Sequence, residues 1–292
     1  MRRNTISAFN IVVSIIFILV CFATVYPFIY AFSFSVSEYM LSAKKAVILL
    51  PRGFTLQNYY ILASDSKVLK GAFISFARTI TGVVLFVLVT GMCAYSMSKS
   101  RLRGRKIFFI FFVIPMYING GMLPMYMLIR SLGLFNNFLV YILPGCFGGF
   151  FMFLIKVYLE TIPDSLEESA RLDGAGDFHI ATRIYAPLSL PVIATASLFV
   201  GVAQWNSWFD ALLYISNKEM YPLQMVLQEI LRQTQINNIL DTFELTTRQK
   251  PKINAESYKM AVLIVTTLPI VFIYPFAQKY FVKGLMIGAV KM

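Results

Sequence analysis

Long apolar stretches without a charged side chain alternate along this chain with short polar segments. The uncharged stretches are 4–37, 79–98, 107–129, 131–155, 184–209 and 261–278. A helix needs about 20 such residues to cross a bilayer. We therefore predict an all-α, polytopic membrane protein that forms a single domain over 1–292. Its six transmembrane helices are expected at about 9–34, 71–98, 107–129, 136–156, 184–210 and 259–279.

One polar segment, 163–183, combines acidic side chains with signals for helix ends. Ser165 and Glu168 have the Ser-x-x-Glu spacing of a capping box, and Asp164 is an alternative cap. Gly174 would end this short helix and permit a left-handed turn. A second amphipathic run follows the turn. The segment is therefore expected to fold as a helix-turn-helix elbow beside a membrane span, and 163–183 is called the elbow below.

The charge pattern predicts how the chain is oriented. Hydrophobic residues make up 58% of the 292 residues and charged residues only 14%. The net charge of +12 is spread over the links, without a basic face interleaved with aromatic residues, so nucleic acid is not an expected partner. Arg2 and Arg3 precede the first span, and five basic residues crowd the link at 99–106. Basic links stay in the cytoplasm, which also places the elbow and both termini there.

The elbow resembles a known family motif. Glu-Ser-Ala at 168–170, then Gly174, then Ile-Tyr-Ala-Pro at 184–187 are similar in spacing to the EAA loop of ATP-binding-cassette (ABC) importer permeases. Asp-Gly-Ala at 173–175 resembles the carbohydrate branch of that family, which includes the maltose, multiple-sugar and lipo-oligosaccharide types. The resemblance implies that six residues couple the chain to an ATPase: Glu168, Ser169, Ala170, Asp173, Gly174 and Ala175.

The resemblance also implies a fold, a function and a set of partners. It points to an ABC type I importer permease, a non-catalytic subunit in the bacterial plasma (inner) membrane that imports carbohydrate, specifically an oligosaccharide. The implied partners are a second, different permease subunit, two ATPase subunits that bind ATP and Mg, an extracellular solute-binding protein and membrane lipid. The chain itself has no phosphate-binding loop. Movement of the ATPase pair would reach the spans through the elbow.

Two further segments resemble parts of maltose-type permeases. The outer loop, 211–258, starts with an amphipathic helical pattern, and its polar part at 233–257 corresponds to the region that meets the solute-binding protein. A merely solvated loop is the alternative. The tail has a Gly-x-x-x-Gly-x-x-Lys spacing that in the family reaches into the ATPase pair. Three residues carry that spacing: Gly284, Gly288 and Lys291.

Polar and aromatic side chains in or beside the spans are candidates for the substrate pathway. They are Arg78, Tyr117, Asn119, Gln204, Trp205, Asn206, Trp208 and Asp210. Arg78 has no evident acid partner within the membrane, and it either lines the pathway or snorkels to the headgroups. The glycines and prolines of the third and fourth spans serve either close helix packing or a moving pathway wall. The two tryptophans belong either to an interfacial aromatic belt alone or also to a sugar site.

Other chemistry and other functions find less support. The three cysteines and the one histidine show no metal-ligand spacing, so no metal or cofactor is expected in the chain. A stand-alone secondary transporter or channel would need paired ionisable residues at mid-membrane and an internal repeat of spans, and neither is evident. An ABC permease for a non-sugar solute is the other alternative. A membrane enzyme would need a cluster of His, Asp or Cys residues within the apolar region, and no such cluster is evident in the sequence.

Overall fold

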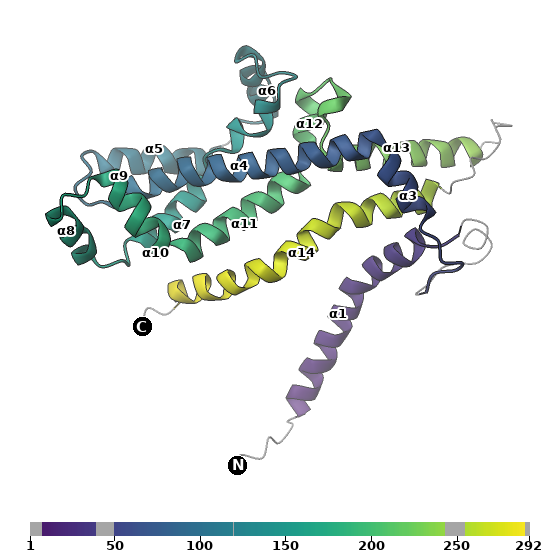
Figure 1. Ribbon diagram of the computed structural model, residues 1–292, viewed down its shortest axis with the longest axis horizontal. Coiled ribbons are helices and arrows are strands. Elements are labelled where there is room, and N and C mark those ends of the chain that lie inside the picture. The colour runs from purple at the N-terminus through teal and green to yellow at the C-terminus, as the bar shows by residue number, and fades with distance from the viewer. Residues whose placement is uncertain (1–7, 39–49, 119, 243–254, 290–292) are drawn as a thin grey trace. The chain divides into compact units, whose positions relative to one another are not determined.

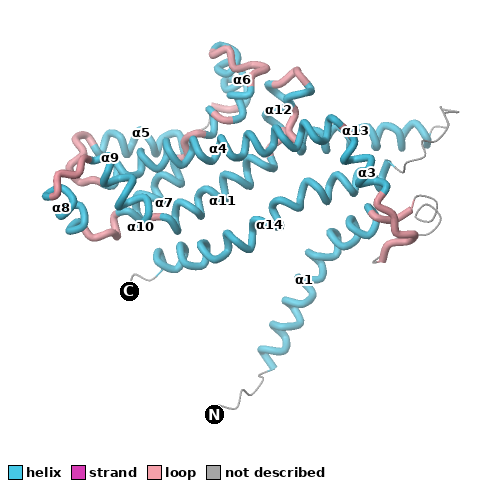
Figure 2. The backbone as a smooth tube through the Cα atoms, viewed as in Figure 1, coloured by secondary structure: helices cyan, strands magenta, loops and turns pink. Residues whose placement is uncertain are grey.

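The computed structural model describes residues 8–38, 50–118, 120–242 and 255–289, and their regular elements are all helical (Figures 1 and 2). The predicted all-α class is confirmed. In chain order the elements are α1 (Ala8–Ser35), α3 (Gln57–Ser64), α4 (Ser66–Ser98), α5 (Arg105–Tyr117), α6 (Met122–Ser131), η1 (Phe138–Tyr141), η2 (Leu143–Gly145), α7 (Gly149–Leu159), α8 (Asp164–Leu172), α9 (Asp177–Ile180), η3 (Ala181–Tyr185), α10 (Ala186–Leu188), α11 (Leu190–Asn206), α12 (Phe209–Tyr214), η4 (Lys218–Met220), α13 (Leu223–Thr242) and α14 (Ala255–Ala289).

Within the described ranges, three helices are individually long and apolar enough to cross a membrane. They are α1, α4 and α14, which qualify over Phe9–Ser35, Ser66–Ser98 and Glu256–Pro275. Three bent pairs also qualify: α5 with α6, the η1–η2 segment with α7, and the α9–α10 segment with α11. The second pair bends by 47° and the third by 81°. Counting each pair as one span gives six, the number expected from the hydrophobic pattern.

The bends fall at the glycines and prolines that interrupt the apolar pattern. Gly121, which precedes α6, has a φ of +85°, a region that side chains other than glycine rarely adopt. Gly148 precedes α7, and Pro191 lies in the first turn of α11, where its missing N–H leaves no helical bond unmade. The same residues that weaken the helical pattern in the sequence therefore set where the helices change direction.

The chain divides into two compact units. The first consists of Met1–Leu69 and Leu227–Leu268, and the second of Lys70–Val226 and Pro269–Met292. In the first unit, side chains of α3 hold the end of α1. Asn58 donates from Nδ2 to the Ser35 carbonyl at 2.8 Å, and the hydroxyls of Ser35 and Tyr59 lie 2.7 Å apart. One of the carbonyls left unpaired at the end of α1 is thereby satisfied.

The core of the second unit forms where α4, α7 and α11 meet the elbow (Figure 1). Its buried side chains come from four stretches of the chain: Phe86, Ala94, Tyr95 and Met97; Met152, Ile155 and Leu159; Ile180, Ala181 and Tyr185; Val192 and Ala196. Ile180 is fully buried although it belongs to the elbow. The elbow is therefore packed into the helix bundle as a structural part of it.

Gly148 provides a test of how closely this core is packed. A Cβ at this position would lie 2.9 Å from Cε2 of Phe86, a buried ring that meets Phe151 edge-on. We expect Gly148→Ala to lower the free energy of unfolding by about 1–3 kcal/mol because the ring must shift. Gly91→Ala on α4 is the control, since nothing lies within 4 Å of its Cβ. Thermal unfolding in detergent should separate the two variants, and equal stabilities would contradict this packing.

Candidate functional site

The first helix of the elbow, α8, begins one residue after Pro163. The predicted capping box is wrong: Pro163 occupies the N-cap position and no side chain caps the helix. Ser165 cannot serve as the cap because the helix has already begun at Asp164. Instead, Asp164 and Glu167 lie in the first turn, where negative charge interacts favourably with the helix dipole.

The turn after α8 depends on Gly174. Its φ of +83° lies in the left-handed region, as predicted. Its N–H donates to the Arg171 carbonyl at 3.0 Å, and the N–H of Ala175 donates to the Ala170 carbonyl at 2.9 Å. These bonds close the end of α8 and turn the chain towards α9.

Two adjacent glutamates of α8 have opposite environments. Glu168 is exposed, whereas the side chain of Glu167 is only 11% exposed. Glu167 accepts hydrogen bonds from Lys99 Nζ, from Arg171 through Nε at 3.1 Å and Nη2 at 2.9 Å, and from the Tyr185 hydroxyl at 3.1 Å. A buried carboxylate is stable only when it is paired in this way. Glu167 thus holds the inner face of the elbow and leaves Glu168 free to meet a partner.

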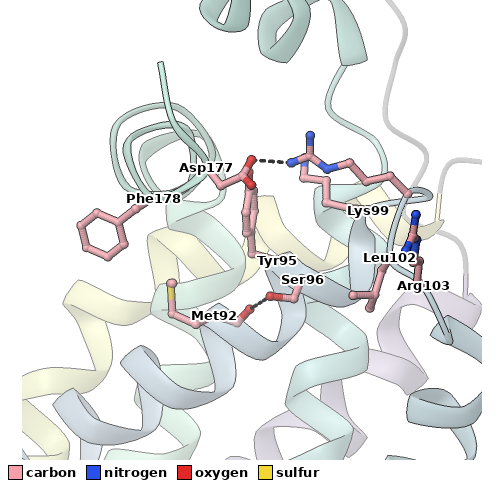
Figure 3. A pocket seen from close by; sticks show the side chains of 9 residues that line it. Met92, Tyr95, Ser96, Lys99, Leu102, Arg103, Asp177 and Phe178 are labelled. Atoms are coloured by element: carbon pink, nitrogen blue, oxygen red, sulfur yellow. Dashed lines mark hydrogen bonds and ion pairs between the residues drawn. The ribbon is translucent and has the colours of Figure 1, made fainter. Parts of the chain in front are cut away.

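The residues around Glu167 form a connected set that joins α4 to the elbow. Lys99, which follows α4, has its Nζ 3.5 Å from the ring centroid of Tyr185 and 4.6 Å from that of Tyr95. Arg101 and Arg171 both donate to Asp177 at the start of α9. We call six of these residues the elbow clamp: Lys99, Arg101, Glu167, Arg171, Asp177 and Tyr185. Figure 3 shows Asp177, Tyr95 and Lys99 among the side chains that line a cavity of about 490 Å³.

Sequence reasoning did not find the elbow clamp. The five basic residues at 99–106 predict only the orientation in the membrane, and the EAA resemblance singles out Glu168 rather than Glu167. The available signal was charge complementarity. The link at 99–106 contains basic residues and no acidic one, whereas the stretch from Glu160 to Asp177 contains six acidic residues. Arg105 and Lys156 both pair with Glu160, which adds a second contact between the same link and the elbow side of α7.

The ion pairs of Glu167 predict a pH dependence of stability. Burial acts to raise the pKa of this carboxyl, but hydrogen bonds from Lys99 and Arg171 outweigh burial and hold the pKa below its ordinary value of 4.5. A lowered folded-state pKa stabilises the fold fully above the ordinary pKa, and the contribution is lost as the pH falls through the lowered value. At pH 7 the melting temperature of the wild type should therefore be higher than that of Glu167→Gln. The difference between the two melting temperatures should become smaller below pH 4.5, and a difference that grows on acidification would contradict the pairing.

The outer face of the elbow carries both acidic and apolar side chains in exposed positions. Glu168, Ser169, Asp173 and Gly174 are exposed, and Ala170 and Ala175 are half-buried. Leu172 is 89% exposed and Phe178 is 70% exposed. Large apolar side chains at such exposure are typical of a surface that another protein covers. Four of the six residues that the EAA resemblance singles out are therefore exposed beside these apolar side chains, whereas Ala170 and Ala175 pack against the core. Glu168 has no ion pair among the described residues.

A second polar cluster lies in the bundle, at the break between α11 and α12. The Arg78 side chain is 1% exposed and donates to Gln204 Oε1 at 3.1 and 2.9 Å, to the Ser207 carbonyl at 3.2 Å, and to both oxygens of Asp210 at 3.2 and 2.5 Å. These bonds use all five of its N–H donors. The guanidinium also lies 4.3 Å from the ring centroid of Tyr141. Snorkelling to the headgroups, one of the two expectations for Arg78, is wrong.

The expectation that Arg78 lacks an acid partner is also wrong. Asp210 lies 132 residues further along the chain, at the end of the fifth predicted span, and only the fold brings the two together. Arg78, Gln204 and Asp210 line a cavity of about 450 Å³ together with Tyr141 and Tyr214. Because Arg78 has no donor left, it fixes the cavity wall by holding the α11–α12 break against α4.

The other pathway candidates that the structure describes do not line this cavity. Trp205 is buried and packs edge-on against Phe76, with ring centroids 5.0 Å apart. Trp208 packs against Phe209, and Asn206 accepts a hydrogen bond from Gln224 at 3.2 Å. Tyr117, at the end of α5, is 84% exposed. Asn119 lies outside the described residues.

The remaining predicted segments are described only in part. Gly284 and Gly288 lie in α14, whereas Lys291 falls outside the described residues. The amphipathic helix predicted after residue 211 is present as α13, and Leu223, Val226 and Leu227 are buried. Within the docking segment at 233–257, residues 243–254 lie outside the described ranges. No group of three metal-binding side chains is found in the described part of the chain.

Comparison with known proteins shows what kind of chain carries this elbow. The family model of binding-protein-dependent transport system inner membrane components matches residues 86–287. The chain belongs to this family. The matched region includes the C-terminal part of α4 and the whole elbow, and the chain is therefore an inner membrane permease component of a transport system.

Individual relatives cover nearly the whole permease. It is 37% identical to the protein LplC of Bacillus subtilis (strain 168), over 92% of this chain and 90% of that one. It is 36% identical to the polygalacturonan/rhamnogalacturonan transport system permease protein YtcP of the same strain, over 95% of each. The permease is also similar to one chain in the crystal structure of a bacterial ABC transporter that is involved in the import of the acidic polysaccharide alginate. The two chains superpose with a TM-score of 0.86 and are 29% identical. That match covers 96% of the permease and 99% of the other chain.

Proposed function

We propose that this permease forms half of the translocation pathway of an ATP-driven oligosaccharide importer. The elbow receives the movement of the ATPase subunits on the cytoplasmic side of the membrane. The observation that carries the proposal is the division of the elbow into two faces. Glu167 anchors the inner face, whereas Glu168 and Leu172 remain exposed on the outer face.

The outer face has the chemistry of a docking surface. Leu172 and Phe178 supply apolar anchors, and Glu168 supplies a charge for an Arg of the ATPase. Ser169 and Ala170 are small enough for close approach, and Gly174 sets the turn between the two arms. When the two ATPase subunits close on ATP and Mg, the elbow moves as one body and carries α7 and α11 with it.

The partners and the orientation follow the same proposal. The complete importer contains this chain, a second, different permease subunit, two ATPase subunits and an extracellular solute-binding protein. Both termini lie in the cytoplasm, where Gly284, Gly288 and Lys291 contact the ATPase pair. The charge distribution supports this orientation, since the basic link at 99–106 pairs with the elbow.

An oligosaccharide is the substrate that the comparisons favour. YtcP is described as a polygalacturonan and rhamnogalacturonan permease, and the structural neighbour as an alginate importer. The cavity beside Arg78 and Asp210 is walled by Tyr141 and Tyr214, and aromatic rings next to polar groups suit a sugar. We place the pathway at this cavity, with Gln204 and Asp210 in its wall.

Purification from the native membrane tests the proposed assembly. An affinity-tagged chain should bring down an ATPase subunit and a second permease subunit. For the orientation, Arg103→Cys, at an exposed position in the basic link, is introduced into a chain whose Cys21, Cys93 and Cys146 have been replaced by alanine. A membrane-impermeant maleimide should label it only after the cells are opened. Labelling of intact cells, or purification of the chain without an ATPase, would overturn the proposal.

A further inference from the structure

The elbow is joined to its neighbouring spans in two different ways. It follows α7 and precedes α11 in the chain, so those helices are bonded to it covalently. Its contacts with α4 are non-covalent. They comprise the apolar core that Tyr95 and Met97 share with Ile180 and Ala181, and the ion pairs of the elbow clamp, in which Lys99 contacts Glu167 and Arg101 contacts Asp177. The ion pairs are the polar, directional part of this connection.

The clamp has the burial and geometry needed to transmit such a movement. The side chains of Lys99 and Glu167 are 12% and 11% exposed, and the Lys99 ammonium lies over two tyrosine rings. By contrast, the pair between Lys70 and Glu219 near the other end of α4 is 54% and 69% exposed. Exposed pairs contribute little to stability because water screens them, whereas breaking a buried pair is strongly destabilising because it leaves an uncompensated charge.

The helix α4 connects the clamp to the cavity. It runs over 33 residues without an internal proline, and at a rise of about 1.5 Å per residue the distance from Lys99 to Arg78 is about 30 Å. Further towards the N-terminal end of α4, Arg78 is bonded to Gln204 and Asp210 in the cavity wall. Elbow, clamp, α4 and cavity wall are thus one continuous set of packed and hydrogen-bonded elements.

We propose that Lys99 is a positioning residue for coupling: through Glu167 it makes α4 move with the elbow, so that ATPase movement reaches the Arg78 end of the cavity directly. This inference rests on the proposed function. Lys99 touches neither the substrate nor the ATPase in this account. It acts only by tying α4 to α8, and its loss separates ATP hydrolysis from transport.

The test compares uptake of a labelled oligosaccharide with ATP hydrolysis in proteoliposomes that contain the complete importer. Lys99→Met should lower the amount transported per ATP at least about tenfold, as expected for the loss of a buried charge pair, while hydrolysis continues. Lys99→Arg, which keeps the cation, should retain most of the ratio. Lys70→Met, which breaks the exposed pair on the same helix, is the matched control and should transport as the wild type does.

Further variants keep the test decisive if Lys99→Met does not assemble. Glu167→Gln keeps the size of the side chain and removes its charge, and it should lower the same ratio about threefold or more, because a charged pair becomes a neutral hydrogen bond. A wild-type ratio in Lys99→Met or Glu167→Gln overturns the inference and leaves the proposed function intact. Absence of ATP-dependent uptake by the wild-type importer would instead overturn the proposed function.

Discussion

Glu168→Lys is expected to reduce ATP-driven uptake about tenfold or more while the chain still folds. Glu168 is exposed on α8 and takes part in none of the ion pairs found among the described residues, so we expect its replacement to leave the bundle folded. At a docked surface, however, losing one partner of a charge pair costs about 2–5 kcal/mol, and the new Lys repels the Arg expected on the ATPase. The measurement is uptake and substrate-stimulated ATP hydrolysis by the reconstituted importer.

Glu219→Lys is the matched control for this charge reversal. Glu219 is also an exposed acid, and a surface pair with Lys70 is its only ion pair among the described residues. We expect wild-type uptake from this variant, because one surface pair contributes little. If Glu168→Lys assembled with the ATPase and showed wild-type substrate-stimulated turnover, the coupling role of the elbow would be refuted.

Arg78→Met should destabilise the permease by about 3–5 kcal/mol, because it leaves the carboxylate of Asp210 and the Gln204 side chain without their common donor. The substitution keeps much of the side-chain volume, so the loss reports on charge and hydrogen bonds rather than on a cavity. Thermal unfolding of the purified protein in detergent measures the effect. A large drop in the melting temperature would identify Arg78 as the residue that fixes the cavity wall.

A second variant separates this structural role from substrate binding. Adding Asp210→Asn removes the unpaired charge, so Arg78→Met with Asp210→Asn should be more stable than Arg78→Met alone. If Arg78 instead served mainly as a substrate ligand, Arg78→Met would have the same melting temperature as the wild type, and only the affinity for sugar would change. That outcome would contradict the saturated hydrogen bonding of the guanidinium.

Features that depend on local sequence could be predicted. The six apolar stretches predicted the helical class and the number of candidate spans, because chain length and hydropathy decide both. The positive φ of Gly174 followed from its place after a short acidic helix. The capping box failed because Ser-x-x-Glu spacing does not show which residue starts the helix, and here Pro163 takes the cap position.

Features that depend on distant contacts could not be predicted. Arg78 and Asp210 are too far apart in the chain for any local pattern to pair them, and the same holds for Lys99 and Glu167, which lie 68 residues apart. The choice between Glu167 and Glu168 depends on which side of α8 faces the bundle. The motif specifies only the order of the residues. The side of α8 that faces the bundle is determined by how the elbow packs against α4, α7 and α11.

Sugar accumulation in proteoliposomes tests the central claim most directly. The complete importer, with ATP on the side of the elbow, should raise the internal concentration of a labelled oligosaccharide above the external one. Omitting either ATP or the ATPase subunits should abolish this accumulation. Uphill accumulation by the purified permease alone would contradict the account, because the chain would then supply its own energy.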